Sequence, residues 1–285
     1  MKVSIVIPCY NGARDLPDAI ESCMQQTYRD LEIFIVDDGS RDNSHEIASS
    51  YARKDSRVRA LKHEVNAGVS QAWNTGFRAS SGELMARLCH DDYYTADAIE
   101  EMVAALRLRP DAGLAYTDAR IVTEQGSFVR EKRLEGPETA LLSKNGFGQC
   151  VMWRRAVWEK MGGFLSEYDS AEDYEFMQRA MEWFPAVHVE KLLLNERDHE
   201  GRCSHVHSAK QRWVVQRVQS RVIKGGVARR KFLCDGCFDA AYNYREQKKW
   251  AQAFSFLIKA LGYWPFDAKI YKGLAALLFH RARAR

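Results

Sequence analysis

The sequence predicts an α/β fold, a mostly parallel mixed sheet flanked by helices, followed by an all-helical extension. Strand-like and helix-like segments alternate from residue 3 to residue 108, which is typical of strands joined by helical crossovers. Polar motifs directly follow the strand-like segments, and beyond residue 208 only helical spacing of apolar residues remains. We therefore expect two domains, residues 1–207 for the α/β part and residues 208–285 for the helical part.

Short apolar runs rich in β-branched residues indicate the strands of the first half, and apolar residues at helical spacing lie between them. The first run ends at Pro8, and the second ends in the turn-forming residues 37–40. In sheets of this kind, ligands bind beyond the carboxyl ends of the strands. The expected strands are 3–7, 31–36, 58–61 and 84–88, and the expected helices are 15–27, 43–54, 69–80 and 95–108.

The pattern changes after residue 113. A hairpin is expected around Gln125 and Gly126, within residues 121–129. The other elements expected before the extension are strands at 114–118, 148–153 and 186–194 and helices at 155–161 and 172–183.

The C-terminal extension shows helical spacing throughout. Its last three helices resemble stacked hairpins of the tetratricopeptide type, but such arrays need about three repeats of roughly 34 residues to be stable alone. We therefore expect the extension to pack on the rest of the chain or on a partner. The four expected helices are 210–223, 228–247, 250–262 and 267–280.

The composition is that of an ordinary soluble globular protein, with 46% apolar and 28% charged residues. The first apolar stretch is too short for a signal peptide, and no apolar run approaches the roughly 20 residues of a membrane-spanning helix. We therefore expect a cytoplasmic protein whose seven cysteines are free thiols. Cys234 and Cys237 have the spacing of half a zinc site or a redox pair, but no second pair accompanies them, so this use is not favoured.

Basic residues gather in residues 210–231 and 281–285, while the formal net charge is only +4. A solvated helix face is one explanation of such runs. The other is attraction to an anionic membrane surface, which would place the chain at the inner face of a membrane through residues 270–285. We expect no nucleic-acid partner.

Two acidic pairs follow expected strands, Asp37-Asp38 after the second and Asp91-Asp92 after the fourth. Taken alone, each pair is explained by a helix cap or a solvated turn. Their shared place at the ligand-binding edge of the sheet favours a site for Mg²⁺ or Mn²⁺, which prefer oxygen ligands and substrate phosphates. Neither a P-loop nor a Rossmann glycine motif is present, so phosphate binding by a glycine turn is disfavoured.

Several short motifs occur in a fixed order within residues 3–205 and together resemble the family 2 glycosyltransferases. The resemblance implies inverting enzymes with the GT-A nucleotide-diphospho-sugar transferase fold. The motifs are Ile5–Asn11, Val36–Ser40, Asn66–Ser70, Asn74–Gly76, Gly82 ahead of His90–Asp92, Gly162–Phe164, Ala171–Glu175, and Arg197–His199 with Ser204.

The resemblance also implies roles for single residues. Asp173 would be the general base, and Asp92 would coordinate a divalent metal, Mn²⁺ or Mg²⁺. The residues implied in nucleotide-sugar binding are Pro8, Tyr10 and Asn11 around the nucleoside, Asp37 and Asp38 at the base or ribose, Asp91 at the ribose or donor sugar, and Asn66.

Two positions depart from the family pattern. Cys89 stands where an aspartate is common two residues before Asp91, so metal binding would depend on Asp92 and on His199. Trp73 stands where many relatives have an arginine beside Asn74, so a phosphate or ribose contact would be lost.

The expected reaction is transfer of a hexosyl or N-acetylhexosaminyl group from a nucleotide-sugar donor, a UDP-sugar by preference. The acceptor would be a glycan or lipid-linked glycan in surface polysaccharide synthesis. Two alternatives stay open: a nucleotidyltransferase, which the single Gly12 and Arg14 after the first strand disfavour, and a non-catalytic scaffold, which Cys89 favours. Four aromatic residues are read as core or, alternatively, as a sugar-stacking surface: Trp153, Trp158, Phe164 and Trp183.

Overall fold

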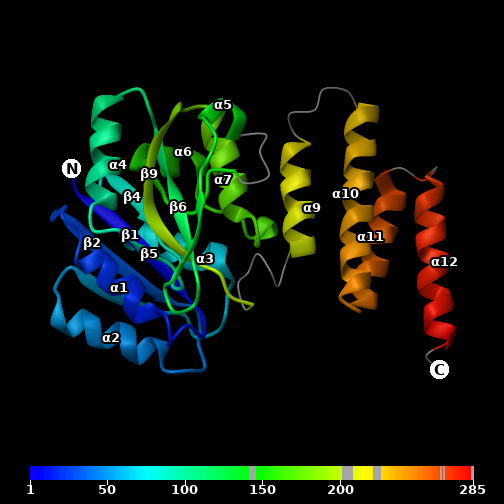
Figure 1. The fold of residues 1–285 in the computed structure, drawn as a ribbon, viewed down its shortest axis with the longest axis horizontal. Helices are drawn as coiled ribbons and strands as arrows, with labels where there is room; N and C mark the ends of the chain where they lie inside the picture. Colours follow the sequence, from blue (N-terminus) through cyan, green and yellow to red (C-terminus); the bar gives the residue numbers. More distant parts are fainter. Residues whose placement is uncertain (141–145, 201–207, 221–225, 264, 266, 284–285) are drawn as a thin grey trace. The chain divides into compact units, whose positions relative to one another are not determined.

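The computed structural model describes residues 1–140, 146–200, 208–220, 226–263, 265 and 267–283 (Figure 1). The chain separates into two compact units, Met1–His199 and Glu200–Arg285.

The first unit contains one mixed sheet. Its strand order is β3-β2-β1-β4-β8-β6-β9-β5, and β7 pairs with β6 outside this order. The strands are β1 Val3–Cys9, β2 Leu31–Asp37, β3 Val58–Lys62, β4 Leu84–Arg87, β5 Tyr93–Tyr94, β6 Leu114–Val122, β7 Phe128–Lys132, β8 Val151–Arg154 and β9 Ala186–Arg197.

The half of the sheet built from β1 to β4 is parallel, as the alternation of strands and helices predicts. The other half is mixed, because β8 runs antiparallel to both β4 and β6 while β9 runs parallel to β6. Helices cover the sheet on its two faces. They are α1 Leu16–Met24, α2 Ser44–Lys54, α3 Val69–Ala79, α4 Ala98–Leu108, α5 Pro137–Ala140, α6 Arg155–Met161 and α7 Glu172–Met181, with a 3₁₀ turn, η1, at Ser166–Tyr168.

Alternate residues of β1 supply the cores on the two faces of the sheet, since successive strand side chains point to opposite sides. Ile5 and Ile7 pack with residues of α1 and α4 in one core. Val6 packs with residues of α3 and α7 in the other. The second core is rich in aromatic side chains, which include Trp73, Phe77, Trp153, Phe164 and Phe176.

The interpretation of Trp153 and Phe164 as core residues is confirmed, because their exposed fractions are only 1% and 3%. Trp158 packs against the same core in a partly buried position. Trp183 differs, with 62% of its surface exposed.

Strand register brings three loops to one edge of the sheet. Pro8 of β1 lies opposite Val36 of β2, and Cys9 lies opposite Asp37. β4 is parallel to β1, with Val6 opposite Arg87, so the chain after β4 leaves at the same edge. The polar motifs after β1, β2 and β4 therefore converge, as the sequence predicts.

Some elements differ from their predicted bounds for reasons of pairing. β9 runs on to Arg197, beyond the predicted end at residue 194, because β6 and the short strand β5 both pair with its second half. β8 starts at Val151, since Gly148 adopts a left-handed φ of 66° that a strand cannot contain. The hairpin around Gly126 is confirmed between β6 and β7.

The second unit is helical in its described part, with α9 Ser208–Gln219, α10 Gly226–Glu246, α11 Trp250–Tyr263 and α12 Ala268–Arg283. α10 and α11 share a core that includes Ala241, Tyr244 and Phe256. Cys234 and Cys237 are buried thiols of this core, and the Trp213 indole donates a hydrogen bond to the Cys237 sulfur at 3.0 Å. The likeness to tetratricopeptide hairpins stays a prediction.

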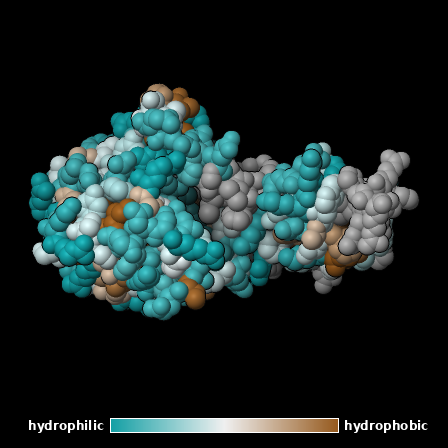
Figure 2. Space-filling model, turned by 90° about the horizontal axis from the view of Figure 1, so that it is seen from below, coloured by the Kyte–Doolittle hydropathy of each residue, from teal (hydrophilic) through white to brown (hydrophobic). Residues whose placement is uncertain are grey.

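The surface seen in Figure 2 is mainly hydrophilic, and its hydrophobic residues form small separate spots. Within the described residues, no helix combines the length and apolarity needed to cross a bilayer. Residues 201–207, which include Ser204 of the last motif, and residues 284–285 of the basic tail lie outside the described residues.

Candidate active site

The loops after β1 and β2 are joined by Asn11. Its backbone N–H donates to Ser40 Oγ at 2.9 Å, and its side-chain Oδ1 accepts the Arg41 N–H at 2.8 Å. Asn11 has a φ of 52°, a left-handed conformation that asparagine tolerates better than most residues. Pro8 is buried within β1, whereas Tyr10 is 41% exposed on the connecting loop. Asn11 thus fixes the loop from which Tyr10 faces solvent.

Asp37 closes β2 and is fully buried. Its Oδ1 accepts the Ser40 N–H at 3.1 Å. Its Oδ2 lies 3.9 Å from His45 Nδ1, and neither of these two buried atoms has a hydrogen-bond partner among the described residues. Buried polar atoms are normally paired, so this contact leaves one carboxylate oxygen and one ring nitrogen to be satisfied by a proton, a water or a ligand.

Asp38 holds the loop that follows β3. Its carboxylate accepts the N–H groups of Ala67 and Gly68, both at 2.9 Å, and lies 2.7 Å from His63 Nδ1. Asn66 is exposed on this loop. The described contacts of Asp38 thus go to the protein, and a nucleotide contact at this side chain would compete with them.

Asp169 also holds the loop that follows β3, at the point where this loop enters α3. Its carboxylate accepts the hydroxyl of Ser70 and, at 3.3 Å, the Ser70 N–H in the first turn of α3. Gly68 separates the two aspartates with a φ of 92°, and a Cβ there would lie 2.6 Å from Asp169 Oδ2. Glycine is therefore needed at this position for both conformation and space.

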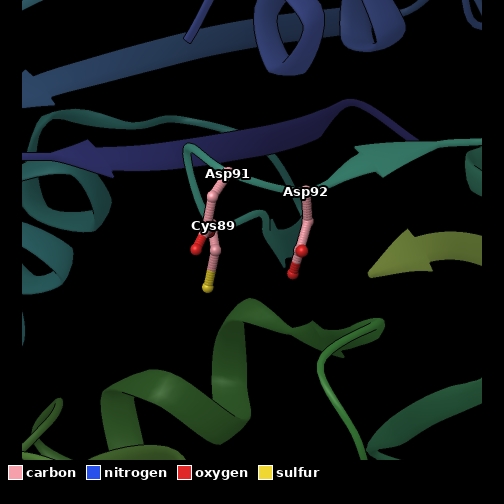
Figure 3. Close-up of side chains that lie close together, drawn as sticks. All are labelled: Cys89, Asp91 and Asp92. Atoms are coloured by element: carbon pink, nitrogen blue, oxygen red, sulfur yellow. The ribbon is translucent and has the colours of Figure 1, made fainter. Parts of the chain in front are cut away.

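The turn after β4 carries Cys89, Asp91 and Asp92, whose side chains point to the same side of the loop (Figure 3). One ligand atom of each residue lies within 4.8 Å of those of the other two. Asp92 is buried, and its Oδ1 accepts the Arg197 N–H at 3.0 Å. Asp91 is more open, and its Oδ2 lies 3.1 Å from His199 Nε2.

His199 and Asp91 stabilise each other's charged forms. Burial favours the neutral form of Asp91, but the hydrogen bond from His199 and the nearby His90 outweigh it, so that the pKa of Asp91 falls to about 2. The hydrogen bond to Asp91 in turn raises the pKa of His199. His199 therefore contacts Asp91, although the sequence paired it with Asp92 in metal binding.

The donor set at this turn fits a divalent cation. Two carboxylates supply hard oxygen ligands of the kind that Mg²⁺ and Mn²⁺ prefer, and the thiol adds a softer ligand. Within the residues that the structure describes, no other group of three histidine, cysteine or acidic side chains meets at this spacing.

Asp173 lies in the first turn of α7. Its Oδ1 accepts the Tyr174 N–H at 2.7 Å, and its Oδ2 forms an ion pair with Arg87 Nη2 at 2.8 Å. Gln149 connects Asp173 to the acidic turn, because its Nε2 lies 3.3 Å from Asp173 Oδ2 and its Oε1 lies 3.7 Å from the Cys89 sulfur. Asp173 and the acidic turn thus belong to one cluster.

Glu172 precedes Asp173 and has a different environment. Burial and the neighbouring charge of Asp173 raise the pKa of Glu172 to about 7. Its Oε2 accepts the N–H of Ser170, which has a φ of 93°. Glu172 therefore stabilises the turn that leads into α7.

Two members of the cluster, Arg87 and Gln149, were not predicted as site residues. The signal for Arg87 was present, because a charged residue inside the apolar run Leu84–Leu88 must be paired if that run is a buried strand. Gln149 gave no such signal, since its contacts come from the fold alone.

Asn74 is buried and forms two hydrogen bonds with the backbone of Phe164, at 2.8 and 2.9 Å. A Cβ at Gly163 would lie 2.5 Å from Asn74 Oδ1. Asn74 thus holds the glycine motif at 162–164 in place. The adjacent Trp73 is fully buried in the core.

Comparison with known proteins identifies the family. The family description "Glycosyl transferase family 2" matches residues 4–160, more than half of the chain. The chain belongs to glycosyl transferase family 2. An uncharacterized glycosyltransferase of Rickettsia felis is 30% identical over 217 residues, which cover 71% of this chain and 35% of the relative. The chondroitin synthase of Escherichia coli is 28% identical over 68% of this chain and 28% of the relative.

Solved structures share the fold of this family 2 member. TarS 1–349 of S. aureus has a TM-score of 0.68 at 18% identity, covering 100% of this chain and 92% of that one. The mannosyltransferase PcManGT of Pyrobaculum calidifontis, solved with GDP-Man and Mn²⁺, has a TM-score of 0.60 at 15% identity, covering 98% and 87%. The predicted GT-A fold with a helical C-terminal region is thereby confirmed. The chain spans only about a quarter to a third of the length of the first curated relatives.

Proposed function

We propose that this glycosyltransferase moves a sugar from a nucleotide-diphosphate donor to a hydroxyl acceptor with inversion, and that Asp173 is the general base. The observation that carries the proposal is the side chain of Gln149, which contacts both Cys89 and Asp173. The carboxylate proposed as base therefore lies one side chain away from the turn proposed to hold the donor.

The donor would bind at the edge where the loops after β1, β2 and β4 converge. Tyr10 is exposed there for contact with the nucleoside, beside Asn11 on the same loop. Pro8 and Asp37 lie near the ends of β1 and β2, and Asn66 lies on the loop after β3. Asp38 is the weakest member of this set, because loop N–H groups already occupy its carboxylate.

The acidic turn would bind the donor diphosphate through a divalent cation, Mn²⁺ or Mg²⁺. Asp92 and Asp91 would hold the ion, with His199 acting through its contact with Asp91. When bound, the cation neutralises the negative charge that develops on the leaving diphosphate. PcManGT was solved with Mn²⁺, which supports this choice of metal.

Asp173 would remove the proton of the acceptor hydroxyl as the hydroxyl oxygen attacks the anomeric carbon. A positioned carboxylate of this kind contributes typically 10²–10⁴-fold to the rate. The bond between the anomeric carbon and the diphosphate oxygen breaks, its electron pair leaves with the diphosphate, and the proton ends on Asp173. A single displacement from the opposite side inverts the anomeric configuration.

We propose a UDP-sugar donor carrying a hexosyl or N-acetylhexosaminyl group, because structures of TarS contain UDP and UDP-GlcNAc. A glycan or lipid-linked glycan acceptor is supported by the chondroitin synthase among the relatives. The proposed location is the cytoplasmic face of a membrane, reached through the basic, apolar tail at residues 270–285. Unchanged co-sedimentation with anionic vesicles after removal of this tail would argue against that location.

The test is sugar release or transfer from UDP-sugars in the presence of Mn²⁺. Asp173→Asn should lower the turnover number about 10²–10⁴-fold because the proton acceptor is lost, while UDP still binds at the loops that this change leaves intact. Glu182→Gln is the matched control, an acid-to-amide change at an exposed position at the end of the same helix. Full activity in Asp173→Asn would exclude Asp173 as the base, and no activity with any donor in the unmodified chain would favour a non-catalytic scaffold.

A further inference from the structure

Arg87 is a buried cation at the end of the apolar strand β4, with 3% of its surface exposed. Its Nη2 donates to Asp173 Oδ2 at 2.8 Å, to Gln149 Oε1 at 2.6 Å and to the Gly148 carbonyl at 3.4 Å. Its guanidinium lies over the ring of Trp73, 5.7 Å from the ring centre. All of these partners lie outside β4, so Arg87 connects this strand to three other segments.

Burial of a charge is costly unless the charge is paired and hydrogen-bonded, and removal of one partner of such a pair is strongly unfavourable. A whole buried ion pair, by contrast, can often be replaced by well-packed apolar residues at little cost to stability. Stability alone therefore gives no reason for a pair of Arg87 and Asp173 here, and the position of this pair beside Gln149 and the acidic turn points to a role in the site.

Arg87 is also placed rigidly with respect to the acidic turn. It is paired in the sheet with Val6 of β1 on one side and with Val151 of β8 on the other. Only Leu88 separates it from Cys89, the first residue of the metal-ligating group. The strand that carries the acidic turn thus also carries the cation that holds Asp173.

We propose that Arg87 is a positioning residue for sugar transfer, which fixes the Asp173 carboxylate relative to the donor-binding turn. This inference rests on the proposed function, in which Asp173 is the base. Arg87 does not touch the reacting atoms in this proposal. It acts through Asp173, and Gln149 assists it from the same side.

The hydrogen bonds of Asp173 show which oxygen would take the proton. Each carboxylate oxygen can accept about two hydrogen bonds. Oδ2 accepts from both Arg87 and Gln149, whereas Oδ1 accepts the backbone N–H of Tyr174. The remaining acceptor direction of Oδ1 is therefore assigned to the acceptor hydroxyl, and Arg87 holds the other oxygen.

The experiment compares Arg87→Gln and Arg87→Lys with Arg154→Gln. Arg154 of β8 is a matched control, because its guanidinium also donates hydrogen bonds to backbone carbonyls, those of Ala112 and Leu106. It lies opposite Leu84, at the end of β4 that is away from the acidic turn. Turnover number, donor KM, UDP affinity and Tm are measured for each full-length variant.

Arg87→Gln should lower the turnover number about 10²-fold, the size expected when a reacting group is misplaced by about 1 Å, and leave donor KM and UDP affinity within about twofold. Arg87→Lys should recover part of the loss, because it keeps the charge but not the planar geometry. Arg154→Gln should lower Tm without lowering the turnover number selectively relative to donor KM. Equal turnover in Arg87→Gln and the unmodified chain would overturn the inference, and so would parallel changes in turnover and KM that Arg154→Gln reproduces.

The double variant Arg87→Gln/Asp173→Asn separates this inference from the proposed function. If Arg87 acts through Asp173, the double variant should turn over no more slowly than Asp173→Asn alone, since the two effects are not additive. Additive losses would show that Arg87 acts elsewhere. If Asp173→Asn itself kept full activity, the proposed base would be wrong whatever Arg87 does.

Should Arg87→Gln fail to fold, Arg87→Lys alone carries the test. A turnover number of Arg87→Lys equal to that of the unmodified chain, with UDP affinity retained, would then contradict the inference.

Discussion

Cys89 places a thiol beside the carboxylates of Asp91 and Asp92, with ligand atoms within 4.8 Å of one another. Burial and the two neighbouring carboxylates raise the pKa of Cys89 well above its ordinary value. A neutral thiol binds a hard cation such as Mg²⁺ much more weakly than a third carboxylate would. Cys89 should therefore limit the affinity of the turn for Mg²⁺.

Cys89→Asp should raise Mg²⁺ affinity about tenfold, equivalent to about 1.4 kcal/mol, because a third hard oxygen replaces sulfur. Isothermal titration of Mg²⁺ in the presence of UDP measures the change. Cys89→Ser is the control for loss of the sulfur without a new charge. Equal Mg²⁺ affinity in Cys89→Asp and Cys89→Ser would show that position 89 does not face the ion.

At the scale of elements, the edge of the sheet opposite the site is held by Glu32 of β2. Its carboxylate accepts Ser4 Oγ of β1 at 2.6 Å and the Gly82 N–H before β4 at 3.1 Å, and pairs with Lys2 Nζ at 2.6 Å. One carboxylate therefore joins the starts of the three strands whose other ends carry the site. Burial favours its neutral form, but these contacts outweigh burial and lower the pKa of Glu32 to about 2.

The low pKa of Glu32 predicts a pH-dependent contribution to stability. A carboxyl group whose pKa is lower in the folded than in the unfolded state stabilises the fold above its unfolded pKa of 4.5, and this stability is lost as pH falls toward 2. Glu32→Gln should therefore lower the free energy of unfolding by up to about 3 kcal/mol at pH 7. Urea denaturation at pH 7, 5 and 3.5 should show the difference from the unmodified chain shrinking at the lowest pH.

Glu64→Gln serves as the control for Glu32→Gln, since Glu64 is exposed on the loop after β3. A difference for Glu32→Gln that stays constant from pH 7 to pH 3.5 would show that its contacts do not depend on the charge.

Local pattern predicted the elements well, and tertiary pairing explains what it missed. The short β-branched run Ile5–Ile7 indicated a buried strand, and the structure buries it on both faces of the sheet. The place of Asp91-Asp92 after β4 indicated the edge that carries the proposed site. The contact of Arg87 with Asp173, 86 residues away, has no signature in the local pattern. Likewise, nothing near Asp38 in sequence indicates that it holds the N–H groups of residues 67 and 68.

At the scale of the whole molecule, the α/β unit Met1–His199 contains every residue of the proposed site. The family match, residues 4–160, lies within this unit and ends before Asp173 and His199. For the helical unit, the basic, apolar tail at residues 270–285 makes a membrane surface the proposed partner.

A thermal-shift series with UDP-, GDP- and dTDP-sugars, each with Mn²⁺ or with a chelator, measures whether a nucleotide-sugar binds through a divalent cation. One donor, a UDP-sugar by our proposal, should raise Tm by about 5 °C at a concentration 100-fold above its Kd, and only with Mn²⁺ present. Asp91→Asn should abolish the Mn²⁺-dependent part of the shift, measured from the Tm of this variant in the absence of ligand, which the loss of the contact with His199 should lower. A shift of the same size in the chelator, or no shift with any of the three donors, would show that none of these nucleotide-sugars binds through a cation.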